Sequence, residues 1–283
     1  SNNSFLTKFE CQVNKIETLN IKNGNNTNLT GEFFNASNNP DLTCIFVDDV
    51  SYSNTTWTNI DSTSTFVTDE AECDALFTAI PDANFELALI DLGIDTNSTP
   101  DFQVPTANIS GVTELDVAVN NISNLTGIEG FTALTYLYCE DNQLTGLDVS
   151  QNTALTQLEC DGNLLTSLNL DQNTALTQLE CDDNQLTGLD VRENTALTKL
   201  YCDGNQLTDL DVSQNTALIK LDCYDNLLTS LDVSENTALT RLFCFDNQLT
   251  GSLDLSNNFF LTEFECQVNK IETLNIKNGN NTN

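Results

Sequence analysis

The sequence predicts a β-rich solenoid of stacked parallel strands, with a short helical opening cap and an irregular closing cap. From Leu134 onward the chain repeats one 21-residue motif, first as LTYLYCEDNQLTGLDVSQNTA and then as LTQLECDGNLLTSLNLDQNTA. A unit this short cannot bury its leucines alone, so its stability must come from stacking on neighbouring units. The period is marked by cysteines that lie 21 residues apart: Cys139, Cys160, Cys181, Cys202, Cys223 and Cys244.

Each 21-residue unit divides into two similar halves, which predict the path of one coil. Both halves read L-x-x-L-x-(L/C)-x-x-N, as in residues 155–163 and 165–173. The alternating L-x-(L/C) core is typical of a short strand with one buried face. The asparagine comes where the chain must turn, and its amide can bond backbone groups of the neighbouring coil. We therefore expect parallel strands and a ladder of stacked asparagines.

A second, longer repeat links the beginning and the end of the sequence. Residues 1–28 and 256–283, offset by 255 residues, differ at only two of 28 positions: Ser4 against Phe259, and Lys8 against Glu263. The simplest inference is a window on a tandem array of units of that length. A duplication made by engineering is the rival explanation, and the two substitutions favour natural drift. We assign 1–28 to the last repeats of a preceding unit and 256–283 to the duplicate repeats of the next.

The short motif resembles the leucine-rich repeat superfamily, and more closely the 21-residue class found in secreted and surface proteins of Bacteroidetes bacteria. The matching pattern is LTxLxCxxNxLTxLDVSxNTA, which covers residues 134–276 and again 6–21. The resemblance implies a right-handed solenoid, parallel strands and an extracellular or bacterial cell-surface location. It does not imply an enzyme.

The segments outside the repeats predict two caps. Residues 38–73 resemble the closing segment of such arrays, and we assign 29–79 to the closing cap and junction. Residues 80–130 form an opening cap helix and degenerate first coils, and the 21-residue repeats follow over 131–255. No linker rich in Pro, Gly or Ser separates these parts, so we expect a packed junction and a semi-rigid rod.

The opening cap helix is predicted over residues 80–94, which read IPDANFELALIDLGI. Asp82 is placed to cap its first turn, and Gly93 is placed to end it. Helical spacing puts three apolar side chains on one face: Phe85, Leu89 and Leu92.

Eight cysteines occupy the second core position of the half-repeat: Cys11, Cys139, Cys160, Cys181, Cys202, Cys223, Cys244 and Cys266. One interpretation is a metal-thiolate or redox ladder, and the other is a column of small, buried free thiols. Neighbouring strands stack about 4.8 Å apart with parallel Cβ vectors, whereas a disulfide needs Cβ atoms ~3.8 Å apart, which favours free thiols. Cys44 and Cys73 lie off this lattice, and in an extracellular protein we expect them to form a disulfide.

The charge composition excludes several classes of function. The chain has 9 Lys+Arg, 42 Asp+Glu and no His, for a net charge of −33. This balance argues against nucleic-acid binding and against docking on anionic lipid, because both need a clustered basic surface. The missing His removes Ser-His-Asp and Cys-His catalysis and imidazole metal sites. No run of about 18 apolar residues occurs, so we expect no membrane insertion.

Strand alternation predicts which side chains face outward, and these positions vary while the frame stays constant. Three of the nine basic residues, Lys199, Lys220 and Arg241, occupy one column in consecutive coils. The candidate binding face combines them with outward aromatic residues of the same side: Tyr136, Tyr138, Tyr201, Tyr224, Phe243 and Phe245. One interpretation is a patch that stacks on sugar rings or anchors a protein partner. The other is that the basic side chains simply neutralise Asp203, Asp222 and their neighbours across the sheet.

The opposite side of the coil carries one aspartate per unit, replaced once by Asn169: Asp148, Asp190, Asp211, Asp232 and Asp254. Clustered carboxylates suit Ca²⁺, but no D-x-D-x-D-G loop or G-G-x-G-x-D repeat occurs, which favours solvated carboxylates. We expect no cofactor, with Ca²⁺ as the alternative. Carboxylate pairs suited to glycosidase chemistry occur everywhere and are singled out nowhere, so we expect no enzyme.

Together these features predict a non-enzymatic extracellular structural or adhesive repeat protein. We expect a shaft or filament unit of a bacterial surface adhesin, which presents a repeated binding face and gains strength by avidity. Its expected partners are neighbouring repeat units of the same chain or filament, and a surface glycan or protein. The alternatives are a discrete protein- or glycan-recognition module attached to a secreted enzyme, and a subunit that assembles end to end through open sheet edges.

Overall fold

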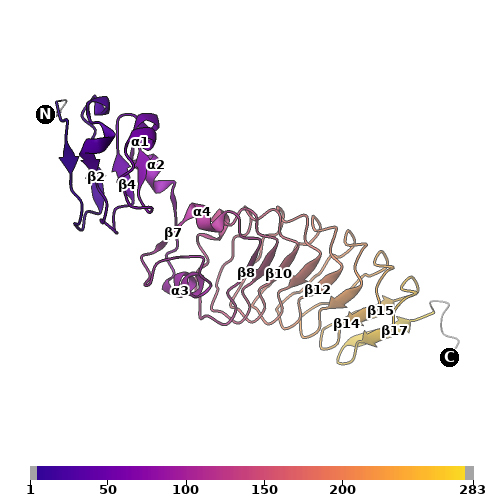
Figure 1. Ribbon diagram of the computed structural model, residues 1–283. Coiled ribbons are helices and arrows are strands. Elements are labelled where there is room, and N and C mark those ends of the chain that lie inside the picture. Colours follow the sequence, from indigo (N-terminus) through magenta and orange to yellow (C-terminus); the bar gives the residue numbers. More distant parts are fainter. Residues whose placement is uncertain (1–4, 278–283) are drawn as a thin grey trace. The chain divides into compact units, whose positions relative to one another are not determined.

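The computed structural model describes residues 5–277, which fall into two compact units divided between Phe77 and Thr78 (Figure 1). The smaller unit contains the first copy of the 28-residue segment and the residues that follow it. The larger unit contains the opening cap and the 21-residue repeats. The packing of the two units against each other stays a prediction.

Eight short strands form the main sheet of the larger unit (Figure 1). Neighbouring strands are parallel and in register, so that Leu158 lies beside Leu179, and Leu179 lies beside Leu200. Each strand is three residues long, because the turn that carries the asparagine follows the L-x-L core almost at once. The strands are β8 (Glu114–Asp116), β9 (Tyr136–Tyr138), β10 (Gln157–Glu159), β11 (Gln178–Glu180), β12 (Lys199–Tyr201), β13 (Lys220–Asp222), β14 (Arg241–Phe243) and β16 (Glu263–Glu265).

The core of the larger unit is a stack of leucine and cysteine columns. The leucine at the centre of each strand from β8 to β14 is 0% exposed. Because every coil adds the same apolar side chains, one continuous cluster extends from Ile80 to Leu255. A second, two-stranded parallel sheet joins the last two coils outside the main sheet, between β15 (Thr250–Asp254) and β17 (Lys270–Asn275).

Two ladders of asparagine side chains join successive coils. In the first ladder, Asn163 Nδ2 donates to the carbonyls of Cys139 and Cys160 at 3.0 and 3.1 Å, and its Oδ1 accepts from the Leu144 amide. In the second, Asn173 Nδ2 donates to two carbonyls of the preceding coil. The predicted ladder is confirmed, and it satisfies backbone groups that the short strands leave unpaired.

The opening cap precedes the first strand of the main sheet. Asp82 Oδ1 accepts from the amides of Asn84 and Phe85, and its Oδ2 accepts from the amide and hydroxyl of Ser123, so it caps the helix and ties it to the first coils. The cap comprises β6 (Phe77–Ala79), α3 (Ala83–Asp91), β7 (Gln103–Pro105), α4 (Thr106–Ile109) and the 3-10 helix η3 (Ile128–Gly130).

The apolar face of α3 differs from the prediction at one position. Phe85 and Leu89 are buried as expected, whereas Leu92 is 49% exposed. The helix ends at Asp91, so Leu92 falls in its C-cap and turns away, while Ala88 packs into the core instead. Among the helices of residues 5–277, none is long and apolar enough to cross a membrane.

The closing cap keeps the parallel pairing of the repeats over residues 34–67, although its strands are short and are separated by 3-10 and α-helical turns. Strand β3 pairs with β1, and β4 lies between β2 and β5 in a parallel three-stranded sheet. Ile45 and Phe66 take the buried middle position that leucine fills in the repeats. The elements of the smaller unit are β1 (Phe9–Glu10), β2 (Thr18–Asn20), η1 (Asn26–Asn28), η2 (Gly31–Phe33), β3 (Phe34–Asn35), β4 (Cys44–Phe46), α1 (Val50–Thr56), β5 (Thr65–Val67) and α2 (Glu70–Asp74).

An aromatic core and a disulfide hold this cap together. The ring of Trp57 stacks on Phe34 with centroids 4.4 Å apart, and its Nε1 donates to the Leu29 carbonyl at 2.8 Å. Cys44 in β4 is bonded to Cys73 in α2, with Cα atoms 6.0 Å apart. Closing a loop of this length stabilises the fold by about 3 kcal/mol, chiefly by restricting the unfolded chain.

Candidate functional site

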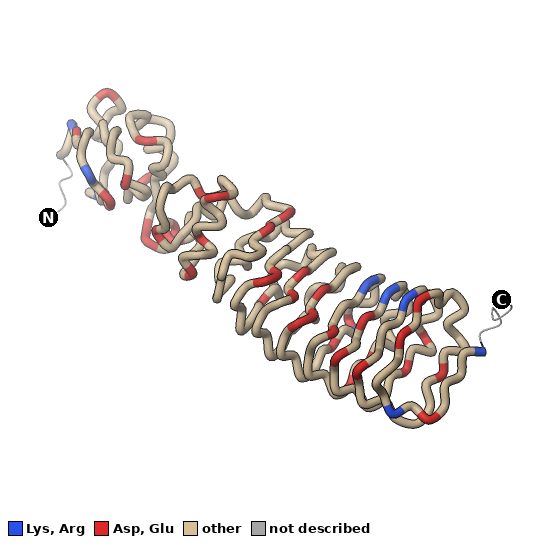
Figure 2. The backbone as a smooth tube through the Cα atoms, turned by 90° about the horizontal axis from the view of Figure 1, so that it is seen from below, with Lys and Arg blue, Asp and Glu red and all other residues tan. Residues whose placement is uncertain are grey.

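The outward side chains of the main sheet form columns, because parallel, in-register strands place equivalent residues side by side. Lys199 pairs with Lys220, and Lys220 pairs with Arg241, as the sequence predicts. A second outward column lies two residues further along each strand and contains Tyr201, Asp222 and Phe243. A third column lies directly after the buried cysteine of each coil and contains Asp203, Tyr224 and Phe245. Figure 2 shows basic positions side by side on adjacent coils of a chain in which acidic residues predominate.

Seven outward side chains form what we call the aromatic–basic patch, on β12 to β14 and the turns that follow β13 and β14. All seven are partly exposed. Neighbouring strands lie about 4.8 Å apart, so the patch spans roughly 10 Å across the sheet. Its members are Lys199, Tyr201, Lys220, Tyr224, Arg241, Phe243 and Phe245.

Arg241 in the patch binds Asp222 on the neighbouring strand. Its Nε and Nη2 donate to the two carboxylate oxygens at 3.0 and 2.5 Å, and its guanidinium lies over the Phe243 ring, 4.1 Å from the centroid. The Asp222 side chain is only 5% exposed. Burial raises the pKa of Asp222 to about 6, although Arg241 and Lys220 act to lower it. Neutralisation of an acidic neighbour therefore describes Arg241 correctly.

Three of the four aromatic members of the patch, Tyr224, Phe243 and Phe245, are in contact with one another, and Tyr224 also binds Asp203. The rings of Tyr224 and Phe245 stack with centroids 4.3 Å apart, and the Phe243 centroid lies 6.5 Å from that of Phe245. A hydrogen bond to the Asp203 carboxylate, together with burial, raises the pKa of the Tyr224 hydroxyl well above its usual value. These three rings therefore form a preformed aromatic surface within the patch.

The structure separates two predicted site residues from the others. Tyr136 and Tyr138 lie on β9, and β10 and β11 come between them and β12. At the ordinary strand spacing, this places the two tyrosines roughly 14 Å from the patch. Lys199 is turned toward the intervening strands, since its Nζ donates to Gln178 Oε1 at 2.9 Å. Strand alternation correctly gave Tyr136 and Tyr138 the same face of the sheet as the patch, but the structure places them apart from it.

The intervening strands carry what we call the acidic half of the face, which consists of Glu159, Asp161, Glu180 and Asp182. Carboxylate oxygens of Asp161, Glu180 and Asp182 lie within 4.8 Å of one another. Burial, followed by neighbouring carboxylates, raises the pKa of Asp161 to about 6 and that of Asp182 to about 7. Such oxygens suit Ca²⁺, but all three side chains are partly open to solvent, where carboxylates are stable without an ion.

A second carboxylate cluster lies in the opening cap and was missed by the sequence reasoning. It consists of Glu86 in α3, and Asp95 and Asp101 in the loop that follows. The three residues do not form a compact motif, so no local pattern reveals them. A signal was present, because no Lys or Arg occurs between Lys22 and Arg192 to balance a buried carboxylate.

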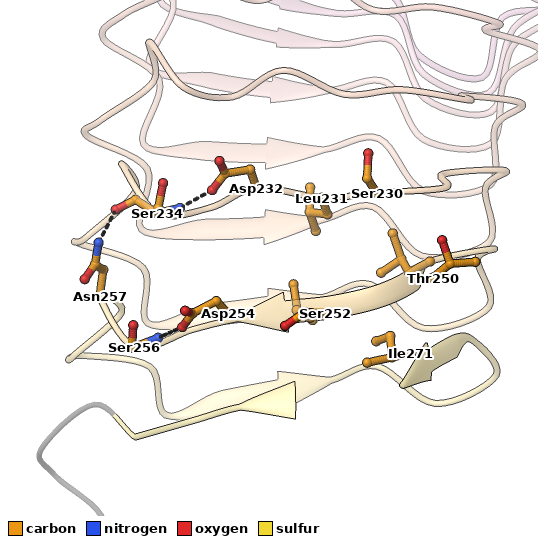
Figure 3. A pocket seen from close by; sticks show the side chains of 12 residues that line it. Ser230, Leu231, Asp232, Ser234, Thr250, Ser252, Asp254, Ser256, Asn257 and Ile271 are labelled. Atoms are coloured by element: carbon orange, nitrogen blue, oxygen red, sulfur yellow. Dashed lines mark hydrogen bonds between the residues drawn. The ribbon is translucent and has the colours of Figure 1, made fainter. Parts of the chain in front are cut away.

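The aspartates that recur once per coil on the other side close turns of the backbone. Asp232 Oδ1 accepts from the Ser234 amide at 2.9 Å, and Asp254 Oδ1 accepts from the Ser256 amide at 2.8 Å, as Figure 3 shows for two adjacent coils. Asn169 closes the equivalent turn of its own coil in the same way. The position therefore needs an acceptor oxygen rather than a charge. Solvated carboxylates stay the prediction for this column, with Ca²⁺ binding as the alternative.

The cysteine column consists of free thiols. Six of the eight unpaired cysteines are buried, and Cys11 and Cys266 are half-buried. Burial raises the pKa of the column's thiols, to about 12 for Cys244. Metal binding and redox exchange need the thiolate, so this arrangement favours an apolar packing role over a metal-thiolate ladder.

Comparison with solved structures relates this geometry to known proteins. The functional domain of InlJ from Listeria monocytogenes, which includes a cysteine ladder, is 38% identical, with 69% of this chain and 48% of that chain covered and a TM-score of 0.56. A leucine-rich repeat protein of Leptospira interrogans is 26% identical, with 62% and 48% covered and a TM-score of 0.56. Internalin C2 of Listeria monocytogenes matches at 24% identity, with 74% and 95% covered and a TM-score of 0.63.

No protein-family model and no curated protein matches the chain. The chain spans about half the length of the InlJ and Leptospira structures that it resembles. These similarities agree with the eight-stranded parallel sheet and with the repeated leucine and asparagine columns. The protein therefore has the parallel β-solenoid fold of leucine-rich repeat proteins.

Proposed function

We propose that this chain is a non-enzymatic recognition module of the leucine-rich repeat type, carried on an extracellular bacterial surface protein. A solenoid with one variable face on a constant frame suits binding to another molecule. The Cys44–Cys73 disulfide supports an extracellular location, because such bonds persist in oxidising compartments. Within this proposal, the 21-residue motif assigns the chain to the repeat class of Bacteroidetes secreted proteins.

The aromatic–basic patch is the observation that carries the proposal. It gathers three of the nine basic residues and four aromatic side chains on three adjacent coils of a chain with net charge −33. Its stacked rings are already ordered, so binding costs little side-chain entropy. Lys220 adds positive charge beside Asp222, next to these rings. The fitting partner is a protein surface with an apolar anchor and nearby acidic groups.

The patch is tested by removing two of its rings. Tyr201→Ala combined with Phe243→Ala should weaken binding of the labelled protein to target cells about 30-fold, as expected when an aromatic anchor is lost. The matched control is Tyr136→Ala combined with Tyr138→Ala, which removes two rings from the same face outside the patch and should leave binding intact. Unchanged binding of the first variant would eliminate the patch as the site. Signal on a glycan array, lost in that variant, would assign the site to sugars instead.

We further propose that the module is one unit of an adhesin shaft. The 28-residue segment that recurs 255 residues later supports a tandem array, in which each unit would add one copy of the patch and binding would gain by avidity. Electron microscopy of the full-length protein should show elongated particles. Isolated compact particles would exclude the shaft without touching the patch. Few units beside a catalytic domain would favour a module on a secreted enzyme, and fibres of single units would favour end-to-end assembly.

A further inference from the structure

The carboxylate cluster of the opening cap brings together three acidic side chains, two of which are removed from solvent. Glu86 is 0% exposed and Asp95 is 2% exposed, whereas Asp101 is open to solvent. One carboxylate oxygen from each of the three lies within 4.8 Å of the others. Buried charges in proteins are paired with an opposite charge or bind a metal ion, so the cluster needs a compensating group.

No basic side chain in the described part of the chain pairs with this cluster. Among residues 5–277, the ion pairs are made by Lys8, Arg192 and Arg241, all outside the cap. The stretch from Lys22 to Arg192 contains no basic residue between its ends. One oxygen of the buried Asp95 carboxylate, Oδ2, has no hydrogen-bond partner. An unpaired carboxylate oxygen inside a folded cap is costly unless something else binds it.

Backbone hydrogen bonds place the cluster rather than neutralise it. Glu86 Oε1 accepts from the amides of Asp101 and Phe102 at 2.7 and 3.0 Å, which folds the loop after α3 back over the helix. Asp95 Oδ1 accepts from the Asn97 amide at 3.1 Å, and Asp101 Oδ2 accepts from Asn97 Nδ2 at 2.9 Å. The loop therefore holds three carboxylates in convergent positions, and each keeps lone pairs free for a further ligand.

We propose that Glu86, Asp95 and Asp101 bind one divalent cation of the calcium class. Calcium binds carboxylate oxygens at about 2.3–2.6 Å, so oxygens no more than 4.8 Å apart can all reach one ion between them. Solvent at Asp101 would supply the remaining ligands as water. The cation would neutralise the buried charge and hold the loop of residues 92–102 against α3. This loop precedes the first coils of the solenoid.

The sheet-face cluster of Asp161, Glu180 and Asp182 provides the internal comparison. Its oxygens are equally close together, but its side chains are all partly exposed. No oxygen of these three side chains is both buried and unpartnered in the described part of the chain. Of these two clusters in the described part of the chain, the one in the cap alone combines convergence with an unpartnered oxygen on a buried side chain, so the two clusters should respond differently to calcium.

The proposal is tested by thermal unfolding of the whole chain in chelator and in about 1 mM Ca²⁺, a concentration typical of extracellular calcium sites. Calcium should raise the melting temperature of the unmodified chain by several degrees, and titration calorimetry should give one ion per chain. Asp95→Asn should abolish both effects, while its melting temperature in chelator should equal or exceed that of the parent, since a buried charge is gone. Asp182→Asn should keep both effects.

Three results would overturn the proposal. The first is that the unmodified chain does not respond to calcium. The second is that Asp95→Asn responds as strongly as the unmodified chain. The third is that Asp182→Asn loses the response, which would place the ion on the sheet face or attribute its binding to the overall negative charge of the protein. Because Asp95→Asn is compared with itself in chelator and in calcium, a change in its folding does not obscure the result. None of these outcomes bears on the aromatic–basic patch.

Discussion

The acidic half of the sheet face and the aromatic–basic patch lie on strands of the same conformation, but they differ in whether a carboxylate is paired with a positive charge. In the acidic half, Asp161 and Asp182 stack beside other carboxylates, and burial raises their pKa to about 6 and about 7. In the patch, Asp222 is more deeply buried but binds Arg241 through two hydrogen bonds. The same parallel strands accommodate both, so these outward positions do not determine the fold.

This difference teaches which residues carry the structure and which are free to carry function. Leucine, cysteine and asparagine columns continue through both regions without interruption. A carboxylate without a counter-charge persists in the acidic half because solvent reaches it and because it can take up a proton. In the patch, by contrast, the guanidinium of Arg241 neutralises the Asp222 carboxylate. We therefore expect the two regions to differ in their response to pH and to the removal of single charges.

The largest expected effect is a loss of stability on raising the pH from 5 to 8. The chain has no His, and the pKa of Asp161, Asp182 and Asp222 is raised to about 6, 7 and 6. Each folded-state pKa lies above the usual value, so the stability that it provides is complete below about pH 4 and is lost as the pH rises through 6 to 7. Allowing for solvent screening, the free energy of unfolding should fall by about 3 kcal/mol.

Urea unfolding at the two pH values, in chelator, measures this fall. The aspartates that close turns, such as Asp190 and Asp211, have a lowered pKa. Their contribution to the free energy of unfolding is lost only as the pH drops below about 4, so they do not affect stability between pH 5 and pH 8. A stability that stays level or rises between pH 5 and pH 8 would show that the outward carboxylates are not protonated together in the folded state.

Arg241→Ala should give the next largest effect, and it acts on the patch alone. It leaves the buried Asp222 carboxylate without its partner and should cost about 2 kcal/mol at pH 7.5, less than a fully buried pair because the Arg241 side chain is 28% exposed. Adding Asp222→Asn should recover most of this loss, and a double-mutant cycle in urea would measure it. If the single and double variants are equally unstable, lost packing on Phe243 rather than charge is the cause.

The repeat pattern predicted the coil, and it offered pairing of the basic column with Asp222 as one interpretation, but it did not predict that Asp222 is buried. Leu158 and Asn163 were placed correctly because each belongs to a local motif whose environment is the same in every coil. The burial of Asp222 was missed because it depends on Arg241 in the next coil, which strand alternation treats as an independent outward residue. The basic column was predicted, since equal spacing in the sequence becomes adjacency in a parallel sheet.

Features outside the period were harder to predict for physical reasons. Leu92 was assigned to the buried face of α3, but the face depends on where the helix ends, and that end is fixed by Gly93 and the loop beyond it. Tyr136 and Tyr138 were grouped with the patch because alternation gives the side of a strand and no distance across the sheet. The cap cluster of Glu86, Asp95 and Asp101 depends on a loop that folds back, which no periodicity describes.

Asp182→Asn should stabilise the protein at pH 8 by about 1.5 kcal/mol, because it removes the carboxylate with the most strongly raised pKa on the face. At pH 5, where Asp182 is already protonated in the folded protein, the gain should be much smaller. Asp211→Asn is the matched control, since an asparagine there can still close the turn as Asn169 does, and it should leave the pH profile unchanged. Equal gains at both pH values would contradict a charge-based cause.

Tyr224→Phe should have the smallest effect and separates the two roles of that side chain. The substitution keeps the ring that stacks on Phe245 but removes the hydroxyl that hydrogen-bonds to Asp203, which is 7% exposed. We expect a loss of about 1 kcal/mol in urea at pH 7.5, typical of one hydrogen bond to a partly screened carboxylate. Tyr224→Leu should cost more and should also weaken binding, because it removes the stacked ring. If Tyr224→Phe alone abolishes binding at unchanged stability, the hydroxyl contacts the partner directly, and the patch recognises a polar group rather than an apolar anchor.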